Sequence, residues 1–123
     1  MIYRQTGTYT KLFRFPGGSS NTVSSFNPGI MSRLTRAMND LGYQYFDWNV
    51  VSGDAGETNK TNKIVEKIEE GCRENRISMI LQHDIKDYSV AAVEDVIVWG
   101  LQNGYSFRAL ELDSPAMHHG VNN

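Results

Sequence analysis

Residues 77–84 read Ile-Ser-Met-Ile-Leu-Gln-His-Asp, a nearly continuous apolar run that ends in an amide, an imidazole and a carboxyl group. Short apolar runs without alternation are typical of parallel strands that are covered on both faces. In a parallel strand–helix–strand fold, the carboxyl ends of the strands open onto one rim. We therefore expect a strand over residues 77–82, with His83 on that rim.

Two earlier segments repeat this arrangement. Residues 11–15 and residues 43–48 are short apolar runs that predict strands, and each is followed by a polar loop, residues 17–21 and residues 49–57. Arg14 and the segment from Asp47 to Asp54 bring the side chains that hydrolytic chemistry uses to the ends of these two runs. The shared rim of the three strands is the candidate site.

Helical periodicity fills the intervals between the strands. The sequence predicts helices over residues 30–41, which end at Gly42, over residues 58–73, and from an N-cap at Ser89 to a stop at Gly104. A fourth strand is expected over residues 105–110. Their apolar faces comprise Ile30, Met31, Leu34, Ala37, Met38 and Leu41; Ile64, Val65, Ile68 and Cys72; and Val90, Val93, Val96, Ile97 and Leu101.

The expected fold class is α/β, with about four strands in a parallel sheet and three main helices joined by right-handed crossovers. With 123 residues, the chain is long enough for one core and too short for two. We expect one partial domain over residues 1–123, with a polar tail from about residue 113. Cys72, the single cysteine, excludes an internal disulfide and is expected to pack as a buried thiol.

Composition argues against several classes of partner. A formal net charge of −2 and a pI near 5.9 give no electrostatic reason to expect nucleic acid or an anionic membrane. No apolar stretch approaches the roughly 20 residues that span a bilayer. Residues 1–5 lack the apolar core of a signal peptide.

Three motifs in order resemble those of a known family. Arg14-Phe15-Pro16, the segment from Trp48 to Asp54, and Leu81-Gln82-His83 are similar to the last three motifs of the polysaccharide deacetylase domain of carbohydrate esterase family four, also called the nodulation-deacetylase homology domain. The resemblance covers nearly the whole chain. It implies the C-terminal half of an irregular (β/α) barrel of the glycoside hydrolase/deacetylase type.

The resemblance also implies roles for individual residues. His83 would be the general acid that protonates the leaving amine, Asp54 would orient His83, and Arg14 would hold the catalytic carboxylate. Trp48, Leu81 and Pro16 would contact the substrate, with Trp48 and Leu81 walling the pocket for the acetyl methyl group. The reaction would be hydrolysis of a carbon–nitrogen, non-peptide bond in an N-acetylated sugar of a bacterial cell-wall glycan such as peptidoglycan.

The first two motifs of the family have no counterpart in this sequence. They are a Thr-Phe-Asp-Asp string, which supplies the base and a metal ligand, and a His-x-x-x-His string, which supplies two metal ligands. The resemblance implies zinc, cobalt or a similar divalent metal in the complete domain, and none held by this chain. We therefore expect the chain to be inactive alone. Val51 and Ala55 also depart from the acidic and tryptophan residues that flank Asp54 in the family pattern.

Other interpretations of the same residues stay open. Trp48 suits a core position as well as a pocket, and Arg14 suits a structural ion pair with Asp47 or Asp54. Residues 17–20, Gly-Gly-Ser-Ser, suggest a phosphate-binding loop but lack a Walker lysine. His118-His119 is expected to be a solvated pair. The chain would then be a non-catalytic carbohydrate-binding relative or, less in keeping with the motifs, a phosphate- or nucleotide-binding module.

Partners follow from the expected half-barrel. Four strands leave two open sheet edges and apolar residues that would face the missing half. The sequence therefore predicts either a homo-oligomer or a partnership with a missing N-terminal half. A full-length parent would act outside the cytoplasm at the cell wall.

Overall fold

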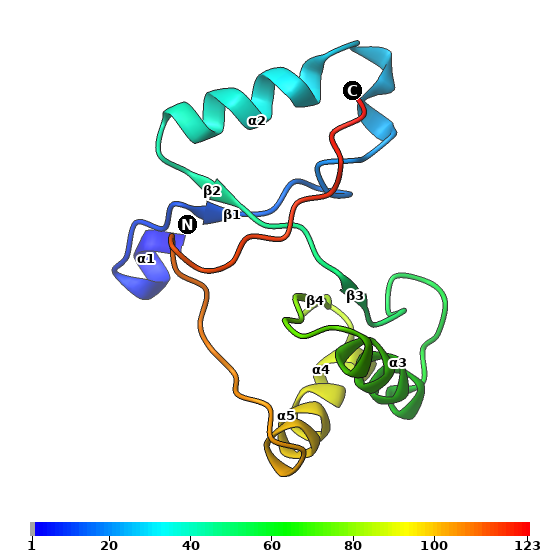
Figure 1. Cartoon of the computed structure of the whole chain (residues 1–123). Coiled ribbons are helices and arrows are strands. Elements are labelled where there is room, and N and C mark those ends of the chain that lie inside the picture. Colours follow the sequence, from blue (N-terminus) through cyan, green and yellow to red (C-terminus); the bar gives the residue numbers. More distant parts are fainter. Residues whose placement is uncertain (1) are drawn as a thin grey trace. The chain divides into compact units, whose positions relative to one another are not determined.

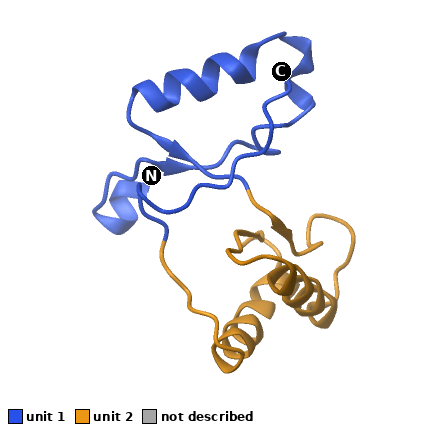
Figure 2. Ribbon diagram, viewed as in Figure 1, with its two compact units in different colours: residues 1–47, 110–123 blue, residues 48–109 orange. Residues whose placement is uncertain are grey.

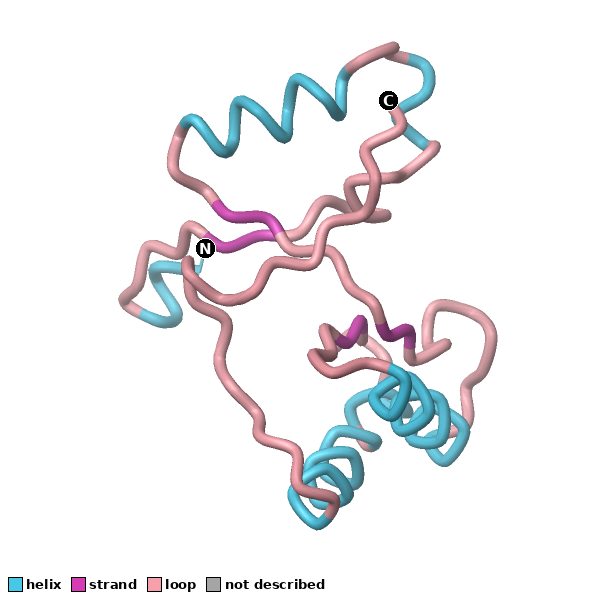
Figure 3. Tube along the Cα trace, in the orientation of Figure 1, coloured by secondary structure: helices cyan, strands magenta, loops and turns pink. Residues whose placement is uncertain are grey.

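The computed structural model describes residues 2–123 as short strands and helices joined by long loops (Figures 1 and 3). The chain divides into two compact units, shown in Figure 2. Unit 1 holds residues 2–47 and 110–123 of the described chain, and unit 2 holds residues 48–109. Each unit is described by itself, so the single domain over residues 1–123 stays a prediction.

Unit 1 contains one parallel strand pair. Strand β1 (Leu12–Phe13) pairs with β2 (Gln44–Tyr45), with Leu12 opposite Gln44 and Phe13 opposite Tyr45. Helix α2 (Ile30–Asp40) connects the strands, preceded by the short helix α1 (Ile2–Thr6) and the 3₁₀ helix η1 (Val23–Phe26). The expected helix and its stop are confirmed, because Gly42 has φ +75°, a left-handed conformation that favours glycine.

Unit 2 contains the second parallel pair. Strand β3 (Val50–Val51) pairs with β4 (Ile80–Leu81), and helix α3 (Thr61–Glu74) connects the two strands. Helices α4 (Asp87–Val90) and α5 (Ala92–Gln102) follow β4. The Asn49 side chain accepts the Met79 N–H at 2.7 Å and donates to Ile77 O at 2.8 Å, which holds the start of β4 in place. Helices α3 and α5 enclose the core of Ile64, Ile68, Cys72, Ala92 and Val96.

The expected inner face of α3 and the packed thiol of Cys72 are confirmed, because Ile64, Ile68 and Cys72 are all buried. The fold class is confirmed in part. The strand–helix repeats are parallel as predicted, but among residues 2–123 they form two two-stranded sheets and no continuous four-stranded one. The expected partial barrel stays a prediction.

Three expected elements are wrong. Strand β3 lies inside the segment 49–57 that was expected to be a loop, since two residues are too few to produce a periodic signal. Residues 105–110 form no strand, and the Phe107 ring instead packs against Gly100 of α5. Ser89 does not cap a helix. It lies inside α4, and its hydroxyl bonds a distant carboxylate.

The C-terminal segment is integrated into unit 1. Asn123 accepts the Gly29 N–H at 2.9 Å, and its amide donates to Ser24 O at 2.8 Å. The expectation of a solvated His118-His119 pair is confirmed in part: His118 is exposed although its ring stacks on Tyr45 at 3.9 Å, whereas His119 is half-buried and its N–H donates to Asp47. These contacts join segments about 70 to 100 positions apart, so no local pattern could reveal them. None of the helices in residues 2–123 is long and apolar enough to cross a membrane.

Gly71 allows α3 to approach β3 closely. A β-carbon at Gly71 would lie 2.6 Å from Val50 Cγ1. Alanine normally stabilises a helix interior by about 1 kcal/mol relative to glycine. Here we expect Gly71→Ala to lower the free energy of unfolding by about 1–3 kcal/mol through overpacking, measured by urea denaturation.

Val50→Ala provides the matched control, because it removes the two γ-carbons that the new β-carbon would meet most closely. The double variant Gly71→Ala/Val50→Ala should be more stable than the sum of the two single effects predicts. Additive effects, or a more stable Gly71→Ala variant, would contradict the close contact.

Candidate active site

The carboxylate of Asp54 is the centre of the site in unit 2. Asp54 lies in the turn after β3 and is only 2% exposed. Gly53 makes this turn possible with φ +79°, and a β-carbon there would lie 2.8 Å from Lys67 Cδ. The Asp54 N–H donates to Ser52 Oγ at 3.3 Å. The loop thus turns the carboxylate into the interior of the unit.

His83 binds this carboxylate twice. Its backbone N–H donates to Asp54 Oδ2 at 2.7 Å, and its ring Nδ1 lies 2.9 Å from Asp54 Oδ1. His83 comes two residues after β4, and the parallel pairing of β3 and β4 brings the ends of both strands to one edge. The motif spacing therefore did identify two residues that touch.

The contact fixes the tautomer of the imidazole. An ionised carboxylate only accepts hydrogen bonds, so Nδ1 carries the proton that faces Asp54. The other ring nitrogen, Nε2, has no hydrogen-bond partner among residues 2–123. The His83 side chain is 29% exposed, so Nε2 is available to exchange a proton with a bound molecule.

Asp54 stays ionised because its hydrogen bonds outweigh its burial. Burial alone would raise the pKa of Asp54, but the Ser89 hydroxyl and the two His83 donors lower it to about 2. Ser89 Oγ donates to Asp54 Oδ2 at 2.6 Å and is itself buried. The site therefore holds an ionised carboxylate beside the imidazole at neutral pH.

The Arg14 motif lies in unit 1. Arg14 and Pro16 are exposed, and Arg14 Nη1 donates to Phe15 O at 3.3 Å. The convergence of Arg14 with His83 stays a prediction, because the two residues belong to different units. Trp48 and Leu81 belong to unit 2 with His83 and are half-buried, so their assignment as pocket walls also stays a prediction.

A second buried carboxylate organises the loop after Pro16. Asp47, 1% exposed, accepts the Ser19 N–H at 2.8 Å, the Ser19 hydroxyl at 2.5 Å and the His119 N–H at 2.8 Å. Burial alone would raise the pKa of Asp47, but these donors hold it below its ordinary value. Asp47 thus links the loop, β2 and the C-terminal segment.

This arrangement argues against the phosphate-loop interpretation of residues 17–20. A phosphate needs free backbone N–H groups and hydroxyls. The N–H and hydroxyl of Ser19 already bind Asp47, and Asn21 Nδ2 bonds the carbonyl of Gly18 at 2.8 Å. The protein's own carboxylate takes the place of the anion.

Sequence reasoning missed Ser19, Ser89 and Gln82 as members of these clusters. Gln82 Nε2 donates to both the carbonyl and the hydroxyl of Ser89, at 3.0 and 3.2 Å. The one local signal was Gln82 itself, the variable position of the Leu-x-His motif. A buried serine in a short helix gives no pattern that separates it from a capping serine.

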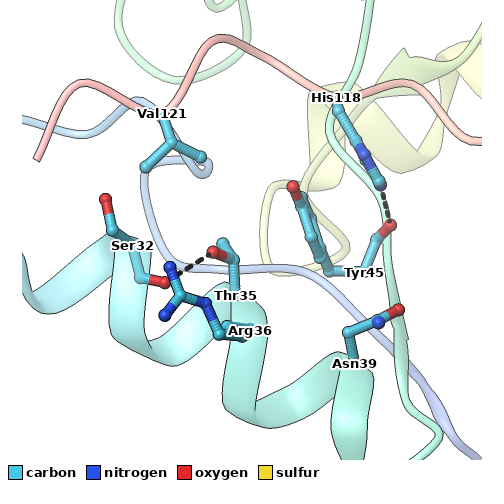
Figure 4. Close-up of a pocket in the computed structure, with 7 residues that line it drawn as sticks. All are labelled: Ser32, Thr35, Arg36, Asn39, Tyr45, His118 and Val121. Carbon is cyan, nitrogen blue, oxygen red and sulfur yellow. Dashed lines mark hydrogen bonds between the residues drawn. The ribbon is translucent and has the colours of Figure 1, made fainter.

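A shallow hollow of about 400 Å³ also lies in unit 1 (Figure 4). The polar side chains of α2 form one wall and the stacked Tyr45 and His118 rings form the other, with His118 Nε2 3.1 Å from Tyr45 O. It contains none of the site residues expected from the sequence. Its lining comprises Ser32, Thr35, Arg36, Asn39, Tyr45, His118 and Val121.

Residues 2–123 contain no group of three or more His, Cys, Asp or Glu side chains that could hold a metal ion. Both oxygens of Asp54 already accept hydrogen bonds from His83, and of the His83 ring nitrogens Nε2 is the one that does not face Asp54. These residues do not fit the divalent metal that the resemblance implies, so no chemical step of this chain is assigned to one.

Comparison with known proteins finds solved structures that are similar to this chain. No protein-family model and no curated protein sequence matches it. The catalytic domain of a peptidoglycan N-acetylglucosamine deacetylase from Eubacterium rectale is 48% identical over 99% of this chain and 56% of that domain, with a TM-score of 0.94. A polysaccharide deacetylase from Bacillus cereus is 27% identical over 95% of this chain and 55% of that structure, with a TM-score of 0.69.

An esterase of carbohydrate esterase family four from Streptococcus mutans shares the fold, at 20% identity and a TM-score of 0.65, over 86% of this chain and 47% of that one. This chain therefore spans about half the length of the solved structures that it matches.

The depressed pKa of Asp54 predicts an acid-sensitive unit 2. A carboxyl group whose folded pKa is about 2 stabilises the fold above its unfolded pKa near 3.8, and this stabilisation is lost as the pH falls towards 2. The difference corresponds to about 2 kcal/mol. Asp54→Asn should lose it at pH 7 and show a flatter dependence of stability on pH between 5 and 2, measured by urea denaturation.

Asp95→Asn, at an exposed position on α5, is the control and should leave the stability at pH 7 within about 0.5 kcal/mol. An Asp54→Asn variant with unchanged stability at pH 7 would contradict the interpretation of the Asp54 hydrogen bonds.

Removal of the Asp47 charge should loosen two remote segments together. Asp47→Asn removes the charge that both segments share and turns one acceptor oxygen into a donor, which faces either the Ser19 N–H at Oδ1 or the Ser19 hydroxyl and the His119 N–H at Oδ2. We expect at least about tenfold faster amide exchange at Ser19 and His119, with α3 in unit 2 unaffected. Hydrogen–deuterium exchange would measure this. Faster exchange at Ser19 alone would contradict the shared anchor.

Proposed function

We propose that the chain is a partial domain of the polysaccharide deacetylases of carbohydrate esterase family four. Within that domain, it supplies the general acid of the deacetylation site. The substrate class is an N-acetylated glycan of the bacterial cell wall, with peptidoglycan favoured by the name of the 48% identical relative. A parent protein with this function acts outside the cytoplasm.

The observation that carries the proposal is the pair of His83 Nδ1 and Asp54 Oδ1 at 2.9 Å, with Nε2 left without a partner among residues 2–123. In amide hydrolysis, water adds to the acetyl carbonyl and the carbon–nitrogen bond breaks. The departing nitrogen needs a proton to leave as an amine. His83 Nε2 donates this proton, and Asp54 stabilises the imidazolium before the transfer.

Arg14, Pro16, Trp48 and Leu81 are assigned supporting roles. The exposed guanidinium of Arg14 holds the catalytic carboxylate, which the motifs of this chain do not provide. Trp48, Leu81 and Pro16 surround the acetyl methyl and exclude water from the carbonyl. The base and the divalent metal would come from residues outside this chain, which is therefore inactive alone.

Exposed apolar faces support the need for a partner. In α5, Val93, Ile97 and Leu101 recur at helical spacing and are 39–61% exposed, and Leu34 of α2 is 39% exposed. Soluble proteins rarely leave such stripes bare. An N-terminal half or a second copy of the chain would cover them.

The test measures amine release from N-acetylglucosamine oligomers with added zinc or cobalt. We expect no release by this chain and release by a version joined to an N-terminal half that carries the two missing motifs. In that version, His83→Ala should lower kcat by about 10²- to 10⁴-fold.

His118→Ala is the matched control, because this histidine lies in unit 1 on Tyr45 and should leave kcat unchanged. Equal activity of the His83→Ala variant would overturn the acid assignment. Oligomer binding without any release by the joined version would favour the non-catalytic carbohydrate-binding alternative.

A further inference from the structure

The hydroxyl of Ser89 is a buried group that the proposed reaction does not yet use. Ser89 lies in α4 and is 1% exposed. Its Oγ is 2.6 Å from Asp54 Oδ2 and 3.2 Å from the amide nitrogen of Gln82. The same Gln82 nitrogen donates to Ser89 O at 3.0 Å. The Gln82 amide thus donates hydrogen bonds to both the carbonyl and the hydroxyl oxygen of Ser89.

The direction of each hydrogen bond follows from the donors available. A hydroxyl has a single proton, and the amide nitrogen of Gln82 can only donate. Ser89 therefore accepts from Gln82 and gives its one proton to Asp54. Each bond in such a chain polarises the next, so the Gln82 contact strengthens the bond from Ser89 to Asp54.

The two bonds at Oδ2 determine which oxygen faces the imidazole. Asp54 Oδ2 receives the His83 N–H from the segment after β4 and the Ser89 hydroxyl from α4. These bonds set the rotation of the carboxylate and leave Oδ1 directed at His83 Nδ1. Without the Ser89 bond, one donor fewer would hold the carboxylate plane.

A nucleophilic role for Ser89 does not fit this geometry. A nucleophilic serine hydroxyl donates to the imidazole and faces the substrate. Ser89 donates to the carboxylate instead and is buried. Its hydroxyl acts on the histidine only through Asp54.

We infer that Ser89, oriented by Gln82, is a positioning residue that holds the Asp54 carboxylate so that His83 keeps its proton on Nδ1 and presents Nε2 to the substrate. The inference deepens the proposed function and rests on it for the meaning of Nε2. The tautomer itself is a property of unit 2 without substrate, because all four residues lie within residues 48–109.

The experiment records the ring nitrogen resonances of ¹⁵N-histidine in the full chain, at a pH where the imidazole is neutral. His83 is assigned by its loss in a His83→Gln variant. In the unsubstituted chain we expect the Nδ1–H tautomer to predominate. Ser89→Ala should lower the ratio of Nδ1–H to Nε2–H by about threefold or more, as expected for the loss of one hydrogen bond. Ser89→Thr, which keeps the hydroxyl, should restore it.

Ser78→Ala is the matched control. Ser78 lies in the same unit, and its Oγ is buried without a hydrogen-bond partner among residues 2–123. The Ser78→Ala substitution removes the same atoms as Ser89→Ala and should leave the His83 tautomer unchanged. Should Ser89→Ala fail to fold, Gln82→Leu, which leaves Ser89 in place but unoriented, is expected to shift the ratio in the same direction.

An unchanged His83 tautomer in folded Ser89→Ala, or in Gln82→Leu if that variant is the one that folds, would overturn the inference, as would an equal shift in Ser78→Ala. This outcome is separate from a failure of the proposed function. Absence of deacetylation by the joined version would leave the tautomer result intact, and an unchanged tautomer would leave the activity assay intact.

Discussion

The buried carboxylate of Asp54 is the interaction on which unit 2 depends. Three segments meet at its two oxygens: the turn after β3, the residues after β4, and α4. An ionised group in this position is costly unless donors replace its water. Here the hydrogen bonds from the donors outweigh the cost of burial, because they lower the pKa of Asp54 to about 2. The interaction that stabilises the loops is thus also the one that orients a histidine.

Asp47 repeats the arrangement in unit 1. Both aspartates follow a short strand, both are nearly inaccessible, and both accept a backbone N–H from a segment distant in the sequence. The strands themselves are only two residues long, so the ladders contribute few hydrogen bonds. Charge-assisted hydrogen bonds are roughly twice as strong as neutral ones. The two carboxylates therefore fix loop positions that such short strands could not fix alone.

The sequence predicted those parts of the fold that repeat locally. The apolar positions of α3 recur at helical spacing, and Ile64, Ile68 and Cys72 are buried as expected. The same reasoning identified α2, where Met31 is the buried residue, because periodicity reports which side of a helix is apolar and not whether anything covers it. Residues 105–110 alternate like a strand, yet Phe107 packs on Gly100 and no strand forms.

The site residues also divide into those that the sequence revealed and those that it did not. His83 and Asp54 were found through motif spacing, because parallel strands bring the ends of successive runs to one edge. The sequence placed Asp47 at the end of the second run but did not reveal its partners, and Ser89 was taken for a helix cap, because a buried serine resembles a cap until its distant partner is known. Prediction from a single sequence therefore finds reactive side chains that belong to known motifs, and it misses the hydrogen-bond partners that fix their positions.

The pair of Asp54 and His83 and the groups that hold it lie in one unit. Asp54, Gln82, His83 and Ser89 lie within 35 positions of one another, and among residues 2–123 their hydrogen bonds stay within unit 2. The orientation of the imidazole is thus set within unit 2, by the turn after β3, the residues after β4, and α4. Under the proposed function, such a site separates two requirements: a proton donor that is preorganised within a continuous segment, and a nucleophile that must be brought to it.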